Sequence, residues 1–456
     1  SSYMHFLNHA ATCNTSTTND VSHTIMSSYE TAKKRKADGH HQGDSDCESN
    51  AATEEGGKTS LAAILAEMKD MRLERNDMKS EMDDMKGRLC RMDELESKCK
   101  LLETKCNSLE SSMKILIKEN KWKYSAPSIP ASHWVDLGFD GDYIEGMKYF
   151  LKQMKESTIE LRSGKDNIDI LLNGGFEYDE DTVLLHDDIL LPHWKEFANA
   201  LQLYQNSGDL LNLSICNVQL TSSVIGLLAS ALKGKQFLKI FEHDRNQFVN
   251  AREGIDFAVK SIGSNQNLEQ FVWLHNPIGI MDNAGYLVEA ITTHPHIDTV
   301  CLGNCFGDDI NGYEILRSLF TSGKSFSHID LERNNIRTGG GTVISDFLAT
   351  NPSLKRLYLA GNHLNDEDAV LIARALKGNT NLSELRLGGN DLTEKGKNAL
   401  SNAIYDSTNL NSMVDCNHTC NITGVDFDDI LENRRSSRGN RARKIYHLLS
   451  WRNQEG

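Results

Sequence analysis

Three side chains that can bind metal lie close together near the C-terminal end of the chain, at Cys416, His418 and Cys420. Thiolate sulfur and imidazole nitrogen are the ligands of structural zinc sites, which normally use four of them. A fourth ligand is not apparent here, and the three residues also suit the turn after a short strand. We therefore predict no metal site and no cofactor.

A second segment with chemical potential is AATEEGGKT at residues 51–59, which is similar to a phosphate-binding loop. Ala52 stands where the first glycine belongs, and the two glutamates inside the loop would repel phosphate. A better explanation is that Thr59 or Ser60 caps the helix that follows. No nucleophile motif or metalloprotease helix is visible, so we predict that the protein is not an enzyme.

A repeated sequence pattern predicts the strands and helices that position most of the side chains considered below. Between residues 210 and 410 it recurs at intervals of 28 to 30 residues. Each copy reads Leu, two residues, an aliphatic residue, one residue, an aliphatic residue, two residues and Asn. The clearest copies span 326–334, 354–362 and 382–390, and weaker ones span 297–305, 268–276, 238–246 and 210–218. With terminal units at 183–188 and 410–418 we expect about nine repeats.

Each copy predicts a short strand followed by a helix. One strand and one helix cannot bury their own apolar faces, so neighbouring copies must stack. Cys305 takes one Asn position, and His243 takes an aliphatic position, which we interpret as a core residue rather than a base. The Asn side chains should turn inward and bond backbone groups that the bend leaves unpaired. We predict an α/β solenoid with parallel strands inside and helices outside.

The spacing and helix content resemble the ribonuclease-inhibitor-like class of leucine-rich repeats, over residues 181–424. The resemblance implies a horseshoe that holds another protein, and the class includes inhibitors, actin-capping proteins, nucleotide-sensing receptors and activators of the Ran GTPase. We therefore expect a non-enzymatic protein-binding scaffold. The alternative is a GTPase-activating protein resembling the Ran activator, although the C-terminus here is basic and that family's usual acidic tail is absent.

The phase of the repeat predicts which side chains line the concave face. Tyr358 lies among several arginines, and such residues are enriched in protein-binding hot spots. The alternative is that opposite charges pair across adjacent strands and form only a solvated face. The expected central row is Glu242, Val272, Cys301, Asp330, Tyr358 and Arg386. The predicted protein-binding residues are Glu242, Gln270, His328, Asp330, Glu332, Arg333, Arg356, Tyr358, Glu384 and Arg386.

Residues 58–121 are rich in Met, Leu, Lys and Glu and contain no proline, which predicts a long helix. Apolar residues recur in sevens, as in a coiled coil, and so narrow a seam needs a partner strand. We expect a homo-oligomer, with most stability from the leucine-rich second half because methionine packs adaptably. The seam consists of Ile64, Met71, Met78, Met85, Met92, Leu95, Leu102, Leu109 and Leu116.

The remaining segments are assigned by composition. Residues 1–57 are polar and should be disordered. They contain Lys33, Lys34, Arg35 and Lys36, interpreted either as a nuclear-localisation signal or as a solvated charge run. Residues 122–180 are predicted to be a linker with an N-terminal capping helix, and residues 425–456 a basic segment with a C-terminal capping helix.

Composition restricts the partners and the compartment. The 456 residues carry a net charge of −15, and 25% of them are charged. The longest apolar stretch is too short to span a membrane. Scattered cysteines favour reduced thiols and an intracellular location, cytoplasmic or nuclear. No aromatic residues are interleaved with the C-terminal arginines, which argues against nucleic-acid binding. The expected partner is a protein that the sequence does not identify.

Overall fold

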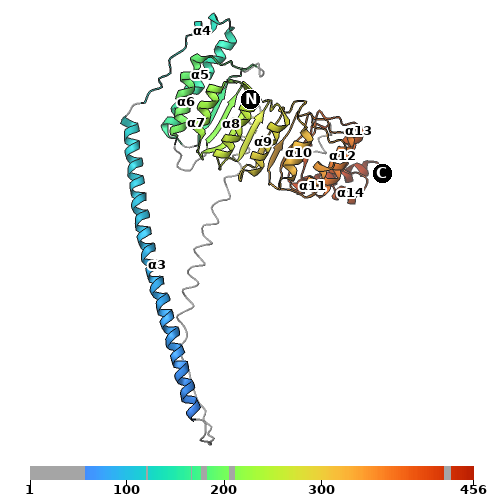
Figure 1. Ribbon diagram of the computed structural model, residues 1–456. Coiled ribbons are helices and arrows are strands. Elements are labelled where there is room, and N and C mark those ends of the chain that lie inside the picture. Colours follow the sequence, from blue (N-terminus) through green and yellow to red (C-terminus); the bar gives the residue numbers. More distant parts are fainter. Residues whose placement is uncertain are drawn as a thin grey trace. The chain divides into compact units, whose positions relative to one another are not determined.

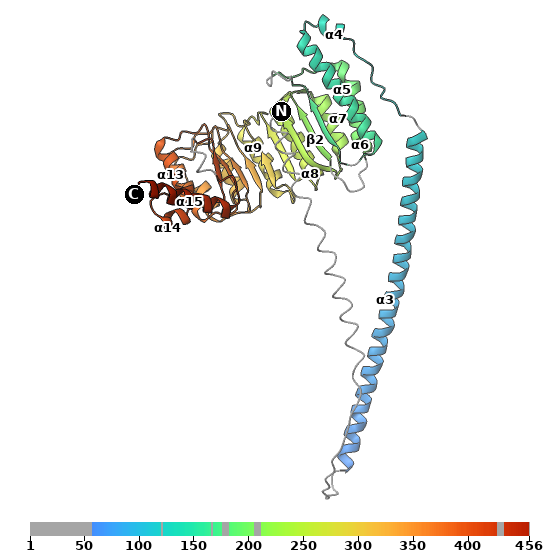
Figure 2. The same cartoon turned by 180° about the vertical axis from the view of Figure 1, so that it is seen from behind.

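The computed structural model describes residues 57–119, 122–165, 167–175, 182–204, 211–425 and 433–455. The chain divides into two compact units, Ser1–Asn120 and Lys121–Gly456 (Figures 1 and 2). Residues 1–56, with Lys33–Lys36, lie outside the described residues, so their predicted disorder and localisation signal stay predictions. Within the described part of the chain, no helix is long and apolar enough to cross a membrane.

In the first unit, α3 (Gly57–Glu119) is one uninterrupted helix (Figure 1). Its proline-free sequence favours helix throughout, as expected. The predicted seam is open to solvent: Met78, Leu102 and Leu109 are 63%, 60% and 68% exposed. Ile64 and Leu116 lie on the same helix, but their side chains are outside the description. The coiled coil itself stays a prediction.

The second unit contains a 9-stranded sheet whose strands follow one another in chain order, every neighbouring pair parallel. A second sheet pairs β3 (Gln219–Leu220) with β5 (Gln247–Phe248). The strands of the large sheet are β1 (Asp169–Asn173), β2 (Leu211–Cys216), β4 (Leu238–Asp244), β6 (Gln270–Leu274), β7 (Thr299–Cys301), β8 (His328–Asp330), β9 (Arg356–Tyr358), β10 (Glu384–Arg386) and β11 (Asn421–Thr423).

Helices connect successive strands and follow one another along the sheet (Figures 1 and 2). Neighbouring helices pack on each other, so each repeat covers the next. The connecting helices are α6 (Leu191–Leu203), α7 (Ser222–Leu232), α8 (Ala251–Ser264), α9 (Met281–Thr293), α10 (Gly312–Thr321), α11 (Val343–Ala349), α12 (Asp366–Gly378), α13 (Glu394–Ile404) and α14 (Leu410–Val414). Helices α4 (Ala131–Asp136) and α5 (Gly141–Ser163) precede β1, and α15 (Ser437–Glu455) follows β11.

The sheet begins earlier than the repeat pattern suggests. Strand β1 lies inside residues 122–180, the range predicted as linker and cap, and pairs with β2. Residues 183–188 contribute only an isolated bridge, Leu184 to Val218. The difference arises because β1 alternates buried Ile170 and Leu172 but continues into Asn173 and two glycines rather than into the repeat's second half.

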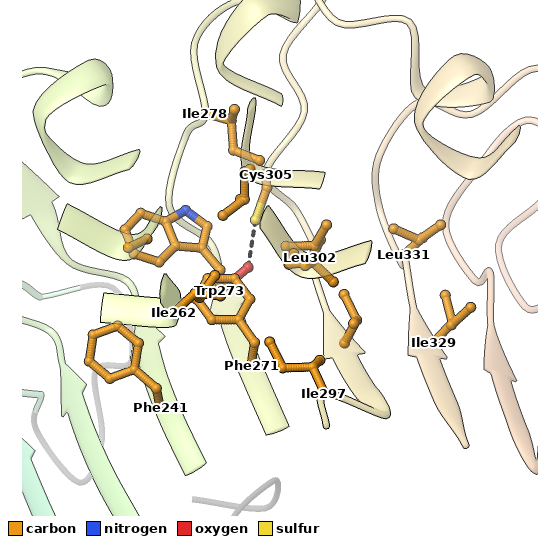
Figure 3. Packing of buried hydrophobic residues seen from close by; sticks show 14 of the residues in the cluster. Phe241, Ile262, Phe271, Trp273, Ile278, Ile297, Leu302, Cys305, Ile329 and Leu331 are labelled. Atoms are coloured by element: carbon orange, nitrogen blue, oxygen red, sulfur yellow. Dashed lines mark hydrogen bonds between the residues drawn. The ribbon is translucent and has the colours of Figure 1, made fainter. Parts of the chain in front are cut away.

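Asparagine side chains tie adjacent repeats together, as predicted. Nδ2 of Asn334 donates to the carbonyl of Leu302 at 2.6 Å, and its Oδ1 accepts from the backbone of Cys305 and Phe306 at 2.8 and 3.1 Å. Cys305 replaces Asn by donating its thiol to the Trp273 carbonyl at 2.7 Å, drawn as a dashed line in Figure 3. Asn246, Asn276, Asn362 and Asn390 also bond carbonyls of the preceding repeat.

The residue directly before the Asn position turns the chain into the next loop. It has positive φ in every unit from β2 onward: Asn217, Arg245, His275, Asn304, Arg333, Gly361, Gly389 and Gly424. Only glycine adopts this left-handed backbone without cost. Arg245, His275 and Arg333 therefore carry local strain that the surrounding hydrogen bonds offset.

Both ends of the sheet are closed by helices. At the N-terminal end α5 packs on β1 and α6 and buries Met147, Phe150 and Met154. At the C-terminal end, α15 buries Asn440, Lys444 and Leu448 completely, and Lys444 is the charged residue among them. Its Nζ is buried and donates to the Ile404 carbonyl at 2.7 Å and to Asn433 Oδ1 at 2.6 Å.

Candidate protein-binding face

Two rows of side chains lie on the concave face because parallel register aligns equivalent positions of adjacent strands. Members of a row are direct partners across neighbouring strands, in the order that the repeat spacing predicts. The central row is Glu242, Val272, Cys301, Asp330, Tyr358 and Arg386. The flanking row is Gln270, Thr299, His328, Arg356 and Glu384.

Much of this face is buried, although the repeat phase alone predicts exposed side chains. Glu242, His328, Asp330 and Tyr358 are 4%, 2%, 1% and 3% exposed. Adjacent strands lie about 4.8 Å apart, so the side chains of a row stack on one another. The part of the face open to a partner comprises exposed Arg333 and the partly exposed Gln270, Glu332, Arg356, Glu384 and Arg386.

Arg386 is held on several sides, in what we call the arginine cluster: Arg386, Tyr358, Glu384 and Glu332. Its guanidinium lies 3.7 Å from the centre of the Tyr358 ring. Its Nε is 2.9 Å from Glu384 Oε1, and its Nη1 is 3.9 Å from Glu332 Oε1. The Tyr358 hydroxyl donates to Glu384 Oε2 at 2.9 Å. The closer ion pair therefore lies within β10, and the longer one joins Arg386 to Glu332, which follows β8.

The electrostatics of the arginine cluster follow from this partial burial. Burial raises the pKa of Glu332 to about 7, and the neighbouring Asp330 carboxylate acts in the same direction. Burial, followed by the Glu384 charge, raises the pKa of Tyr358 and keeps its hydroxyl a proton donor. The cluster therefore presents a guanidinium that is held in place by the buried Tyr358 ring and by Glu384.

Glu242 forms the opposite end of the central row. Glu242 accepts a hydrogen bond from the Ser214 hydroxyl at 2.6 Å. Burial raises the pKa of Glu242, and Ser214 only partly opposes this. Since Glu242 is almost covered, it is poorly placed to contact a partner directly.

His243 lies in the core, as expected. Its ring is fully buried among Phe241, Phe257 and Trp273, and its Nδ1 is 3.1 Å from Asn246 Nδ2. Burial lowers the pKa of His243 to about 3. A neutral imidazole enclosed by aromatic rings has no access to a substrate.

A second grouping was not anticipated from the sequence. Cys301, His328 and Asp330 each bring one possible ligand atom within 4.8 Å of the others. The repeat phase predicted Cys301 beside Asp330 in the central row, but it did not predict that His328 of the flanking row brings a third possible ligand. Aligning the repeats and comparing equivalent positions would have revealed the group. Among the described residues no other group of three gathers in this way, and that includes Cys416, His418 and Cys420.

Two stretches of the chain, residues 350–373 and 378–401, match the family model described as Leucine Rich repeat. They contain β9 with the start of α12, and β10 with most of α13. No curated protein matches the chain. These matches, together with a parallel sheet in which each strand is followed by a helix, fit a leucine-rich-repeat protein.

Proposed function

We propose that this protein is an interaction scaffold that binds a protein partner on its concave face and is joined into oligomers by α3. The observation that carries the proposal is the arginine cluster, in which Arg386 is fixed against Tyr358 and Glu384. Groups already fixed before binding lose little conformational entropy when a partner arrives. Repetition of strand and helix from β2 to α13 supports a ribonuclease-inhibitor-like horseshoe.

The proposed contact surface combines the arginine cluster with its accessible neighbours. Arg333 is exposed at the rim, and Arg356 is half-buried between the cluster and His328. Buried Tyr358 would act by holding the Arg386 guanidinium in place, and buried Asp330 by holding the backbone of Glu332. The partner contacts assigned by this proposal are Gln270, Glu332, Arg333, Arg356, Glu384 and Arg386.

Affinity capture from source cells with the full chain tests the concave face. We compare wild type with Arg386→Ala and Tyr358→Ala, and use Arg337→Ala as the matched control because Arg337 is an exposed arginine away from the strands. A partner retained by wild type and Arg337→Ala but lost by both cluster variants supports the proposal. Equal recovery by all four proteins, each folded by circular dichroism, contradicts it.

The alternative as a GTPase activator makes a distinct prediction. If a captured partner is a GTPase, an activator would accelerate its GTP hydrolysis when added in catalytic amounts. A scaffold would bind the GTPase and leave that rate unchanged. The rate with and without the protein therefore separates the two functions.

Self-association through α3 is proposed because its seam leaves large apolar side chains in water. Leu102 and Leu109, 60% and 68% exposed, are seven residues apart on one stripe of the helix. Burying each against a second copy gains about 1.5–3 kcal/mol. The strict sevens favour another coiled-coil strand over a globular partner.

A matched pair of neighbouring leucines tests the seam. Leu102→Glu should convert the full chain to monomer in light scattering, whereas Leu101→Glu, at an equally open position off the seam, should not. Exposed Cys99, seven residues after Met92 of the seam, reports strand direction. In a parallel, in-register pair, mild oxidation should link Cys99 to its equivalent. A monomeric wild type would rule out self-association.

A further inference from the structure

One group of buried side chains brings three possible metal ligands together on the concave face. Cys301 in β7 is the register partner of Asp330 in β8. His328 precedes Asp330 by two residues on the same strand, so both point to the same face. The thiol sulfur, one imidazole nitrogen and one carboxylate oxygen lie within 4.8 Å of one another. The three residues are 0%, 2% and 1% exposed.

His328 supplies an independent observation. Neither of its ring nitrogens has a hydrogen-bond partner, although the residue is buried with its ring 4.6 Å from the Tyr358 ring. An unpaired buried polar group costs about 1–3 kcal/mol. Two other buried histidines avoid that cost: His193 bonds Tyr124 and the Pro127 carbonyl, and His294 bonds the Asn265 carbonyl. Buried His418 also has two ring nitrogens without a partner, but of these two histidines only His328 lies among possible metal ligands from two other described residues.

The chemistry of the three groups defines the ligand that suits them. Thiolate, imidazole and carboxylate together form a donor set that Zn²⁺ accepts, and three protein ligands leave one coordination position for water. A thiolate and a carboxylate balance the two positive charges of the ion. The Cys301 thiol gives its proton to solvent on binding.

We infer that Cys301, His328 and Asp330 form a zinc-binding site on the concave face. The ion bonds the His328 nitrogen that otherwise has no partner and links β7 to β8 through side chains. Because the His328 ring packs on Tyr358, the site also stiffens the side of the arginine cluster nearest to β8. The inference does not depend on the partner proposal, since metal binding is measurable without any partner.

Cobalt is the probe for the experiment, because Co²⁺ bound to a thiolate absorbs light by charge transfer whereas free Co²⁺ does not. The full chain is stripped of metal with a chelator and titrated with Co²⁺, and Zn²⁺ is then added to displace it. We expect one equivalent of Co²⁺ with the charge-transfer band. Cys301→Ser and His328→Gln should abolish the band or weaken Co²⁺ affinity about tenfold or more.

Matched controls separate this site from other cysteines. Cys305→Ser changes a buried thiol of the same repeat that bonds the Trp273 carbonyl. Cys416→Ser removes a thiol from the Cys416, His418 and Cys420 motif. Both should keep the band, and Zn²⁺ should raise the melting temperature of both and of wild type.

The result that overturns the inference is a folded wild type without the charge-transfer band, or a band that survives Cys301→Ser or disappears with Cys416→Ser. If Cys301→Ser does not fold, Asp330→Asn replaces it, because this change keeps the side-chain size. A folded Asp330→Asn protein with undiminished Co²⁺ affinity would equally overturn the site.

Discussion

At the scale of single residues, the side chains that bridge repeats contribute most to stability. Asn334 is fully buried, and its amide satisfies three backbone groups from the preceding repeat. Removing a buried side chain of this kind leaves its partners unpaired, which costs more than the net value of each hydrogen bond.

We expect Asn334→Ala to lower the free energy of unfolding by about 2–4 kcal/mol, since it leaves three backbone groups without their partner. Urea titration followed by circular dichroism measures the change. Asn411→Ala is the control, because Asn411 is exposed on α14 and should change stability by less than about 0.5 kcal/mol. Equal effects of the two substitutions would contradict the role of the asparagine ladder.

His243 makes stability depend on pH. The unfolded chain takes up a proton with a pKa of about 6.5, whereas burial lowers the folded-state pKa to about 3. The unfolded state thus binds more protons as pH falls below 6.5, and stability decreases down to about pH 3. Between pH 7.5 and pH 5 the wild-type protein should lose about 2 kcal/mol of its free energy of unfolding because of His243. His243→Leu should not lose this amount.

Thermal or urea unfolding of wild type and His243→Leu at the two pH values measures this difference. His296→Gln, which changes an exposed histidine, is the control and should follow wild type. A His243→Leu protein that loses as much stability on acidification as wild type does would show that another group is responsible.

At the scale of elements, the turn from each strand into its loop sets a backbone requirement. Gly389 has φ +67°, and a Cβ there would lie 3.4 Å from the backbone of Gly361. Gly226, exposed in α7, has nothing within 4 Å of such a Cβ. The same substitution should therefore have opposite effects at the two glycines.

We expect Gly389→Ala to destabilise the protein by about 1–2 kcal/mol, the cost of a left-handed backbone for alanine. Gly226→Ala should stabilise it by about 0.5–1 kcal/mol, because alanine favours helix. Chemical unfolding of both variants beside wild type tests the contrast. Loss of stability in both would mean that the turn geometry is not the cause.

The elements also show which parts of the fold follow from sequence. Strand register was predictable because each repeat fixes its own phase, so Cys301, Asp330 and Tyr358 fell into one row. Strand β1 was not predictable from the repeat, because it lacks the Asn-containing half of the pattern. The burial of Asp330 and His328 was also not predictable from the repeat pattern. It depends on the lengths of side chains in neighbouring strands, and a single repeat does not contain that information.

At the scale of the whole molecule, a stack of repeats contacts only its neighbours, so each end can open independently. Asn440, fully buried in α15, donates to the carbonyls of His418 and Arg435 at 2.9 and 2.7 Å and accepts from the Arg435 backbone at 3.0 Å. Asn440 and Lys444 fasten the last helix onto the final repeats.

Asn440→Ala should accelerate amide hydrogen exchange in β10 and β11 while leaving β4 and β6 unchanged, because opening of the end does not require the middle to unfold. Exchange followed by mass spectrometry measures this by segment. Tyr446→Ala, which changes a side chain 75% exposed on the same helix, is the control. Faster exchange in all strands would instead indicate one cooperative unit.

The fastening of the last helix has a consequence for assembly. The outermost strand of any open sheet is a template for another chain, and parallel repeats offer a matching surface for end-to-end growth. Here the Asn433 and Asn440 side chains donate hydrogen bonds to the carbonyls of Asn417, His418 and Cys420, just before β11. We expect a chain without residues 433–455 to expose the edge of β11 and to associate through it, which light scattering would detect as a mass that increases with concentration beyond that of the full chain.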